Sequence, residues 1–344
     1  MKVLVTGAGG FLGVRVVERL LAHGYDDIRC FLRDRGKAEK LLALSESYPD
    51  ARLELCSGNL RSKSDCARAV ADASLIVHLA AGLKGAAAEL FVDSVVASRN
   101  LLDALEERAS KPAEPTRIVL VSSFGVYGVA SLGRGARVDE TTPLEDHPEL
   151  RDPYSHSKLR QEQLFRDYQQ KDGFELVVLR PGVVYGPGGG AFSSRIGLQI
   201  GPVFFHLGGR NLLPLTYVVN CAEAIVLAAG DPGSAGEAYN VHDDDLPTAS
   251  AYLREYKKRV KRIRSVSLPY FVTRMLARSL EAYHRRSQGQ LPAILTPYKV
   301  ASAWAGNRFG NTKLHALGWR PLVATPDAMA ETFEYLRQQD AKKA

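Results

Sequence analysis

A glycine-rich turn near the start of the chain constrains the fold more than any other feature. Lys2–Thr6 is a short apolar run rich in valine, and glycines follow it at positions 7, 9, 10 and 13. Apolar residues at helical spacing occupy residues 11–23, and Gly24 ends that pattern as a C-terminal glycine does. A glycine loop between a buried strand and a helix is typical of dinucleotide-binding units. The sequence therefore predicts an α/β fold with a dinucleotide at this turn.

The residues of this loop have separate tasks. Gly7 allows the tight turn, Gly10 lets the backbone approach a pyrophosphate, and Gly13 permits close packing of helix and strand. The helix N-terminus adds free N–H donors and a partial positive charge, which favour phosphate. We expect the cofactor to contact Gly7, Gly10, Phe11, Leu12 and Gly13.

Strands and helices alternate along the first half of the chain. Five more apolar runs predict strands, at residues 28–32, 52–56, 75–79, 118–122 and 176–179. Between them, helical patterns occupy residues 37–47, 62–71, 88–109 and 155–170. The strands do not alternate in polarity, which indicates that both faces of the sheet are covered. This order predicts a Rossmann-type, doubly wound parallel sheet.

The pattern changes after Arg180, where a smaller lobe begins. Residues 181–214 are rich in glycine and apolar residues without a clear period, and they predict loops and a helix. A helix over residues 217–230 and a strand over 238–241 then return to the sheet. The predicted domains are a dinucleotide-binding domain of residues 1–180 and 217–241, an interleaved C-terminal substrate lobe of residues 181–216 and 242–325, and a C-terminal helix and tail of residues 326–344.

The cysteines and the apolar runs narrow the class of protein. The four cysteines form no C-x-x-C pair and have no histidine cluster nearby, so we expect neither a disulfide nor a metal site. The N-terminus enters a strand without a signal peptide, and no run of 18 apolar residues is present to span a bilayer. A cytoplasmic location is expected.

The net charge of +7 is partly concentrated in residues 254–264. A solvated face explains such a segment most simply, with an anionic substrate or a membrane surface as alternatives. We expect no nucleic-acid partner, because no recognition motif or aromatic platform accompanies the charge. A small-molecule substrate is the expected partner, and contact with a membrane surface is the less favoured option.

The end of the second predicted strand bears on the choice of cofactor. An acidic residue there binds the ribose 2′-hydroxyl of NAD, whereas an arginine accommodates the 2′-phosphate of NADP. Here the strand ends at Arg33, and Asp34 comes one position late. The sequence therefore favours NADP(H) over NAD(H). The alternative is that Arg33 is a surface charge and that Asp34 turns in to hold NAD.

A tyrosine and a lysine near the middle of the chain form a candidate proton-transfer pair. Tyr154 and Lys158 are spaced i, i+4, so they share one face of a helix that begins near Pro153. A nearby ammonium lowers the pKa of a phenol, whose ordinary value is about 10. Ser123 follows the fifth strand, at the edge where such sheets place ligand groups. We interpret Ser123, Tyr154 and Lys158 as catalytic.

Several short motifs resemble the extended short-chain dehydrogenases/reductases, the group that includes the NAD-dependent epimerase/dehydratase superfamily. They are residues 6–13, 58–60, 78–81, 122–128, 154–158 and 180–187, and they extend over much of the chain. The resemblance implies catalytic roles for Ser123, Tyr154 and Lys158, and a homodimer formed through helices 88–109 and 155–170. The further cofactor contacts that it implies are Asn59, Leu60, Leu79, Ala80, Ala81, Lys158, Pro181, Val183 and Val184.

Two positions depart from the pattern of that family. Asn59 stands where the family often has aspartate beside the adenine, and Ser94 stands where it usually has asparagine in the fourth helix. An amide still accepts a hydrogen bond, so the first change is tolerated. The second change leaves open which groups relay the proton in this chain.

The C-terminal part resembles the 3-beta-hydroxysteroid dehydrogenase branch, through Asn220 and residues 236–245, 295–297 and 317–321. This resemblance implies hydride transfer between a secondary alcohol and a ketone, on a sterol-like or other hydrophobic substrate. The rival is a nucleotide-sugar epimerase or dehydratase with the same triad and retained NAD, in which Arg210 and residues 254–264 hold a diphosphate. A non-catalytic dinucleotide sensor is a lesser alternative, because a sensor needs no triad.

Two segments of the lobe have open interpretations. Residues 201–209, with Phe204 and Phe205, either line an apolar pocket or fill the core of the lobe. Residues 268–286 predict an amphipathic helix, for which a lid over the pocket is preferred to lobe packing or membrane-surface contact. Its two faces carry Phe271, Met275 and Leu276 on one side, and Arg274, Arg278, Arg285 and Arg286 on the other.

Overall fold

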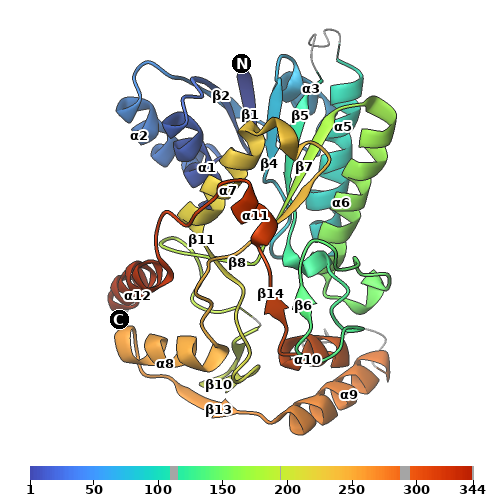
Figure 1. The fold of residues 1–344 in the computed structure, drawn as a ribbon, viewed down its shortest axis with the longest axis vertical. Helices are drawn as coiled ribbons and strands as arrows, with labels where there is room; N and C mark the ends of the chain where they lie inside the picture. The colour runs from blue at the N-terminus through green and yellow to red at the C-terminus, as the bar shows by residue number, and fades with distance from the viewer. Residues whose placement is uncertain (109–114, 194, 287–294, 343–344) are drawn as a thin grey trace.

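Seven parallel strands form the central sheet of the computed structural model, in the order β12-β7-β5-β4-β1-β2-β3 (Figure 1). The structure describes residues 1–108, 115–193, 195–286 and 295–342. The predicted doubly wound parallel sheet is confirmed. Its strands are β1 (Lys2–Thr6), β2 (Asp27–Leu32), β3 (Arg52–Ser57), β4 (Leu75–His78), β5 (Arg117–Val121), β7 (Glu175–Pro181) and β12 (Ala238–Val241).

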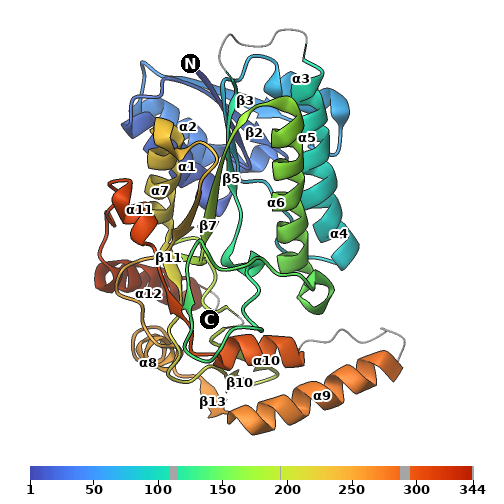
Figure 2. The same ribbon diagram turned by 45° about the vertical axis from the view of Figure 1, so that its right-hand side comes forward.

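Helices cover both faces of this sheet (Figure 2). One face carries α1 (Phe11–Ala22), α2 (Glu39–Ser47) and α7 (Val218–Gly230), and the other carries α3 (Lys63–Val70), α5 (Ala97–Glu106) and α6 (Pro153–Asp172). Successive side chains of a strand point to opposite faces. Val3 and Val5 accordingly belong to the core under α1 and α7, whereas Leu4 belongs to the core under α3 and α5. Burial on both faces explains why these strands read as continuous apolar runs.

The predicted continuous helix over residues 88–109 is interrupted. It divides into α4 (Ala87–Phe91), a π-helical turn η2 (Val92–Val96) and α5, while residue 109 lies outside the described residues. The carbonyl oxygen of Ser94, inside the π turn, accepts hydrogen bonds from Ser98 Oγ at 2.5 Å and from Gln161 Nε2 at 3.3 Å. The side chains of Ser98 and Gln161 therefore hydrogen-bond to a backbone carbonyl of this turn. Such turns are frequent at functional sites.

Small sheets build the lobe below the main sheet. One pairs β8 (Val183–Tyr185) with β11 (Leu215–Tyr217), and another pairs β6 (Arg137–Val138) with β14 (Arg308–Phe309). In the third, β10 (Val203–His206) lies between β9 (Gly197–Ile200) and β13 (Arg264–Ser267). The helix predicted within residues 181–214 is wrong for the described part of that segment, which leaves out residue 194. Gly201, at φ +55°, precedes Pro202 and turns the chain into an antiparallel hairpin instead.

Further helices lie at the foot of the molecule and around the lobe (Figure 1). They are α8 (Ala249–Arg259), α9 (Tyr270–Arg286), α10 (Pro297–Trp304), α11 (Thr312–Ala316) and α12 (Thr325–Ala341). Short 3-10 turns complete the fold, at η1 (Arg35–Lys37), η3 (Phe124–Val126), η4 (Pro148–Leu150) and η5 (Pro232–Ser234). In the part of the chain that the structure describes, no helix combines the length and the apolar character needed to cross a membrane. Residues 287–294 and 343–344 lie outside that part, and the residue ranges assigned to the domains stay a prediction.

Candidate active site

The carboxyl ends of the central strands open into a cavity of about 580 Å³. It extends from the glycine loop after β1 to α6 and α10, which is where open parallel sheets bind ligands. Most of the predicted site residues line it together: Gly7, Gly10, Phe11, Leu12, Gly13, Leu79, Ala81, Ser123, Tyr154, Lys158, Pro181, Val183 and Val184.

Four predicted cofactor residues lie outside this lining. Asn59 uses its side-chain oxygen to accept a hydrogen bond from the Arg61 backbone N–H at 3.0 Å, and Leu60 is buried. The backbone N–H of Ala80 donates to Thr6 Oγ1 at 3.3 Å. Arg33 follows β2 at the same edge of the sheet. These residues are therefore placed beside the cavity without being part of its wall.

The glycine loop fits a dinucleotide in its geometry. Gly7 adopts φ +72°, which favours glycine. A Cβ at Gly13 would lie 2.1 Å from the carbonyl oxygen of Gly7, so only glycine allows α1 to start this close to β1. The N-cap residue of α1, Gly10, supplies no side-chain cap. The first N–H groups of α1 thus need another acceptor, and a pyrophosphate would provide one.

Arg33 and Asp34, the two residues considered for the ribose 2′-position of the cofactor, differ in their interaction partners. The Arg33 side chain is 67% exposed, and its Nη1 lies 3.1 Å from Asp93 Oδ2. Asp34 Oδ1 accepts a hydrogen bond from the Gly36 N–H at 2.9 Å, as the cap of η1. The carboxylate of Asp34 therefore caps its own turn, while the guanidinium of Arg33 is mostly exposed and makes a surface ion pair with Asp93.

Tyr154 sits in the first turn of α6, which begins after Asp152. Asp152 caps the helix by accepting a hydrogen bond from the Ser155 N–H at 3.1 Å. Burial raises the pKa of Tyr154, and a hydrogen bond with Ser123 opposes that rise. The expected lowering by Lys158 is not seen in the protein alone, where Ser123 is the group that opposes the effect of burial on this pKa. Tyr154 is thus a neutral phenol that hydrogen-bonds with Ser123.

Lys158 follows one turn later and is buried. Its Nζ donates to the carbonyl oxygen of Val121 at 2.6 Å and to Oε1 of Gln161. Burial lowers the pKa of Lys158 to about 7, although the negative charge of Glu162 opposes this change. An ammonium with a pKa this low exchanges its proton in the neutral range.

Gln161 joins Lys158 to a buried polar network that the sequence did not predict. Its Nε2 lies 2.8 Å from Ser98 Oγ and 3.2 Å from His78 Nε2, and His78 Nδ1 lies 2.9 Å from Thr6 Oγ1. Burial and the nearby Lys158 lower the pKa of His78 to about 3, so its imidazole is neutral. The only sequence signal for this network was the i, i+3 spacing of Lys158 and Gln161.

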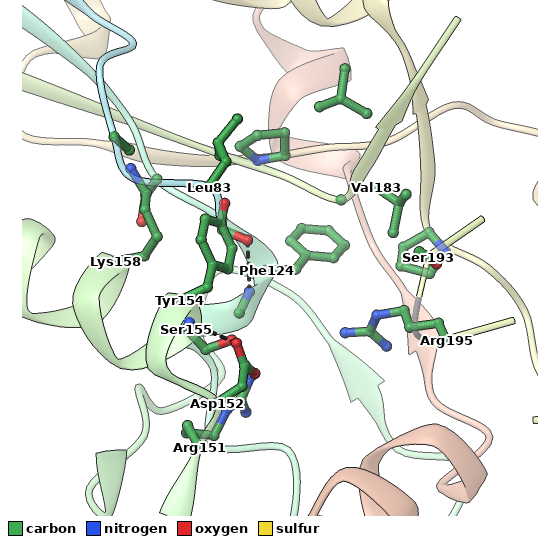
Figure 3. A pocket seen from close by; sticks show the side chains of 18 of the residues that line it. Leu83, Phe124, Arg151, Asp152, Tyr154, Ser155, Lys158, Val183, Ser193 and Arg195 are labelled. Carbon is green, nitrogen blue, oxygen red and sulfur yellow. Dashed lines mark hydrogen bonds between the residues drawn. The ribbon is translucent and has the colours of Figure 1, made fainter. Parts of the chain in front are cut away.

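Arg195 lies on the wall opposite Tyr154, with its guanidinium directed into the cavity (Figure 3). Among the described residues its side chain has no hydrogen bond or ion pair, and its guanidinium carbon lies over the Phe309 ring, 6.0 Å from the centroid. Burial, together with the charge of Arg151, lowers the pKa of Arg195 to about 10. Ser193 Oγ, beside it, is buried and finds no hydrogen-bond partner in the described part of the chain. These groups suit an anion that enters from the cavity.

The structure bears on two interpretations of the lobe that the sequence left open. Arg210 is exposed and does not line the cavity, so Arg195 holds the position that the sequence had assigned to it. Phe204 is buried in the lobe core against Phe192, which identifies it as a packing residue. Apolar lining comes instead from Leu198, Leu207, Pro214 and Leu295.

Comparisons with known proteins agree with this geometry. Residues 3–241 match the model of the NAD dependent epimerase/dehydratase family. The chain is 31% identical to an uncharacterized UDP-glucose epimerase of Bacillus subtilis over 70% of its length and 76% of the relative. It is 28% identical to a 3 beta-hydroxysteroid dehydrogenase/Delta 5-->4-isomerase of Mycobacterium tuberculosis, over 97% of the chain and 90% of the relative. A solved UDP-glucose 4-epimerase of Thermus thermophilus in complex with NAD has the same fold, with a TM-score of 0.68, 23% identity, and coverage of 98% of this chain and 99% of that one.

Proposed function

Because the chain belongs to the NAD-dependent epimerase/dehydratase family of extended short-chain dehydrogenases/reductases, we propose that it interconverts a secondary alcohol and a ketone by hydride transfer. The observation that carries this proposal is the contact between Ser123 and Tyr154, one helical turn from Lys158, in a cavity that reaches the glycine loop. A proton donor and a dinucleotide site in one cavity are the two parts that this reaction needs.

The roles of the three side chains follow from their positions. The nicotinamide of the bound cofactor supplies the hydride for the carbonyl carbon. Tyr154, held neutral by burial, donates a proton to the carbonyl oxygen, and the Ser123 hydroxyl hydrogen-bonds that oxygen. Lys158, one helical turn further along α6, would orient the nicotinamide ribose, and the positive charge of its ammonium would favour the tyrosinate that remains.

The cofactor proposed is NADP(H) in preference to NAD(H). Arg33 is exposed after β2, where a 2′-phosphate could compete with Asp93 for its guanidinium, whereas Asp34 accepts a hydrogen bond from the Gly36 N–H. An arginine binds phosphate with bidentate, charge-assisted hydrogen bonds. An aspartate that is already capping a turn is poorly placed to bind the 2′-hydroxyl of NAD.

The substrate proposed has an apolar body and an anionic group. Leu198, Leu207 and Leu295 give the cavity an apolar part, and Arg195 gives it a positive charge without a described partner. A hydrophobic ketone with a carboxylate or phosphate satisfies both. Arg195 also favours the second candidate, a nucleotide-sugar epimerase or dehydratase, because a diphosphate would neutralise it. A non-catalytic sensor is disfavoured by the intact triad.

The nucleotide released on denaturation of freshly purified protein distinguishes the two candidates. An epimerase recycles its cofactor in place, so it retains a stoichiometric amount of NAD. A reductase exchanges its cofactor at each turnover, so we expect an empty site or a substoichiometric amount of NADP(H). Stoichiometric NAD that resists exchange would overturn the proposed net oxidoreduction and the choice of NADP(H).

A further inference from the structure

Helix α9 exposes large apolar side chains to solvent. Phe271 and Met275 are each 67% exposed, and Leu276, Leu280 and Tyr283 are exposed as well. Among the side chains of α9 that the structure describes, the fully buried ones are the small Thr273 and Ala277. Ala277 packs with Val300 of α10. The helix thus turns its small residues toward the protein and its large apolar residues toward solvent.

The exposed side chains form a continuous face. At about 100° per residue, Met275 projects roughly 180° away from the side on which Thr273 and Ala277 are buried. Phe271 lies about 40° from Met275 on that outward face. Arg274 and Arg278 follow one edge of it and are exposed. An apolar face bordered by arginines is the pattern of a helix that lies in a membrane interface.

Positive charge predominates in the segment that contains α9, although Lys261 is paired with Asp340 of α12. Residues 261–286 contain seven lysines and arginines and a single acidic residue, Glu281, which is partly buried. Arg264 at the start of β13 and Arg262 just before it are exposed, and β13 lies next to the start of α9 at the foot of the molecule (Figures 1 and 2). The side chain of Arg285 lies outside the described residues. Anionic headgroups would complement this charge.

We propose that α9 docks this protein on the surface of a bilayer that contains anionic lipids. The apolar face enters the boundary between headgroups and acyl chains, and the flanking arginines contact lipid phosphates. A second copy of the chain is a poorer occupant, because a two-fold interface would bring the same arginines together with little acidic charge to pair them. The inference does not depend on the proposed reaction.

This placement replaces the expectation of a lid. Among the described residues of α9, none lines the cavity, whereas Tyr298, Ser302 and Ala303 of α10 do. Helix α10 therefore separates α9 from the cavity. A bilayer under α9 would lie one helix away from the substrate site, on the side where Leu295 contributes apolar lining.

A site-specific fluorescent label tests the docking directly. All four native cysteines are buried, so Met275→Cys provides an accessible thiol for an environment-sensitive dye. The matched control is Leu42→Cys on α2, a position that is 51% exposed at the other end of the molecule. With phosphatidylcholine vesicles that contain about 30% phosphatidylglycerol, we expect blue-shifted, brighter emission at position 275 and no change at position 42.

Unlabelled variants then separate the apolar and the charged contributions. Phe271→Ser combined with Leu276→Ser should lower vesicle co-sedimentation more than tenfold. Arg274→Gln and Arg278→Gln should each weaken binding about fivefold. An unchanged thermal melt shows that these exposed positions do not affect folding. Absence of wild-type binding to the anionic vesicles would overturn the proposal. So would an equal response at position 42, or a concentration-dependent dimer that the apolar variant abolishes while vesicle binding stays unchanged.

Discussion

The side-chain oxygen of Gln161 accepts a hydrogen bond from Lys158 Nζ, and its amide nitrogen continues to Ser98 Oγ at 2.8 Å. Both Gln161 and Lys158 are buried, so solvent does not compete for these bonds. The position and the pKa of Lys158 therefore depend on a side chain that does not line the cavity. Gln161 is thus a positioning residue, which acts on the reaction through Lys158.

Gln161→Glu and Gln161→Leu should shift the pH dependence of turnover in opposite directions. A carboxylate beside Lys158 favours the ammonium and raises its pKa, whereas removal of the acceptor disfavours the ammonium and lowers it. We expect the apparent pKa that reports Lys158 in the pH profile to rise in Gln161→Glu and to fall in Gln161→Leu. Turnover of Gln161→Leu should also be reduced at least about tenfold. The measurement is kcat/KM between about pH 5 and 10, with the exposed Gln170→Leu as control. Profiles that coincide for all variants would show a merely structural role.

Burial of Lys158 should make the stability of the protein depend on pH. Its folded pKa of about 7 lies below its ordinary value of 10.5, so between these values the unfolded chain binds more protons. The destabilisation from this group is complete below about pH 7 and disappears as the pH rises toward 10.5. Lys158→Met should therefore gain stability relative to wild type at low pH, by up to about 5 kcal/mol, with the gain shrinking at high pH.

Urea unfolding at several pH values measures this difference. The matched control is Lys40→Met, because Lys40 is exposed on α2. If the difference in free energy of unfolding between Lys158→Met and the wild type stays constant from pH 6 to about 10, it would contradict a depressed pKa of Lys158.

Substitution by methionine should change the stability of the protein in opposite directions at two arginines of the cavity wall, Arg195 and Arg151. Arg195 has no described ion pair, so Arg195→Met removes an uncompensated charge and should stabilise the protein by about 1–3 kcal/mol. Arg151 donates to the Tyr298 hydroxyl at 2.6 Å and to the Tyr127 carbonyl at 3.0 Å, so Arg151→Met should destabilise it. Thermal melts of both variants check the contrast. Equal losses of stability would mean that Arg195 is paired within the protein.

Arg33→Ser should change cofactor preference without changing the chemistry. Loss of a charge-assisted contact with the 2′-phosphate should raise KM for NADPH about tenfold or more and leave KM for NADH nearly unchanged. Arg35→Ser is the control, because Arg35 Nε is engaged with Ser57 Oγ at 2.8 Å. An equal effect on both cofactors would place Arg33 outside the nucleotide site.

The sequence predicted those parts of the fold that rest on local patterns. The strand, glycine loop and helix of residues 2–22 follow from apolar spacing and from the steric need for glycine at positions 7 and 13. The shared face of Tyr154 and Lys158 follows from helical geometry alone. These features involve residues that are close in sequence, so the sequence pattern is sufficient to find them.

The features that the sequence did not predict depend on distant contacts. The partners of Gln161 come from β4 and α5, which are more than sixty residues away along the chain. The direction of Arg195 depends on how a glycine-rich loop folds against the rest of the cavity. The sequence predicted that α9 is amphipathic, but the face that points inward is decided by the close approach of α10 to Ala277. Tertiary packing decides such cases, and periodicity does not.

The most direct test of the proposed chemistry is Tyr154→Phe, measured as hydride transfer by the absorbance of the reduced cofactor together with cofactor binding. Phenylalanine keeps the ring but removes the proton that the reaction requires. We predict that turnover falls by on the order of 10²–10⁴-fold while the Kd for the cofactor changes little. Turnover equal to that of the wild type would contradict the central role of Tyr154.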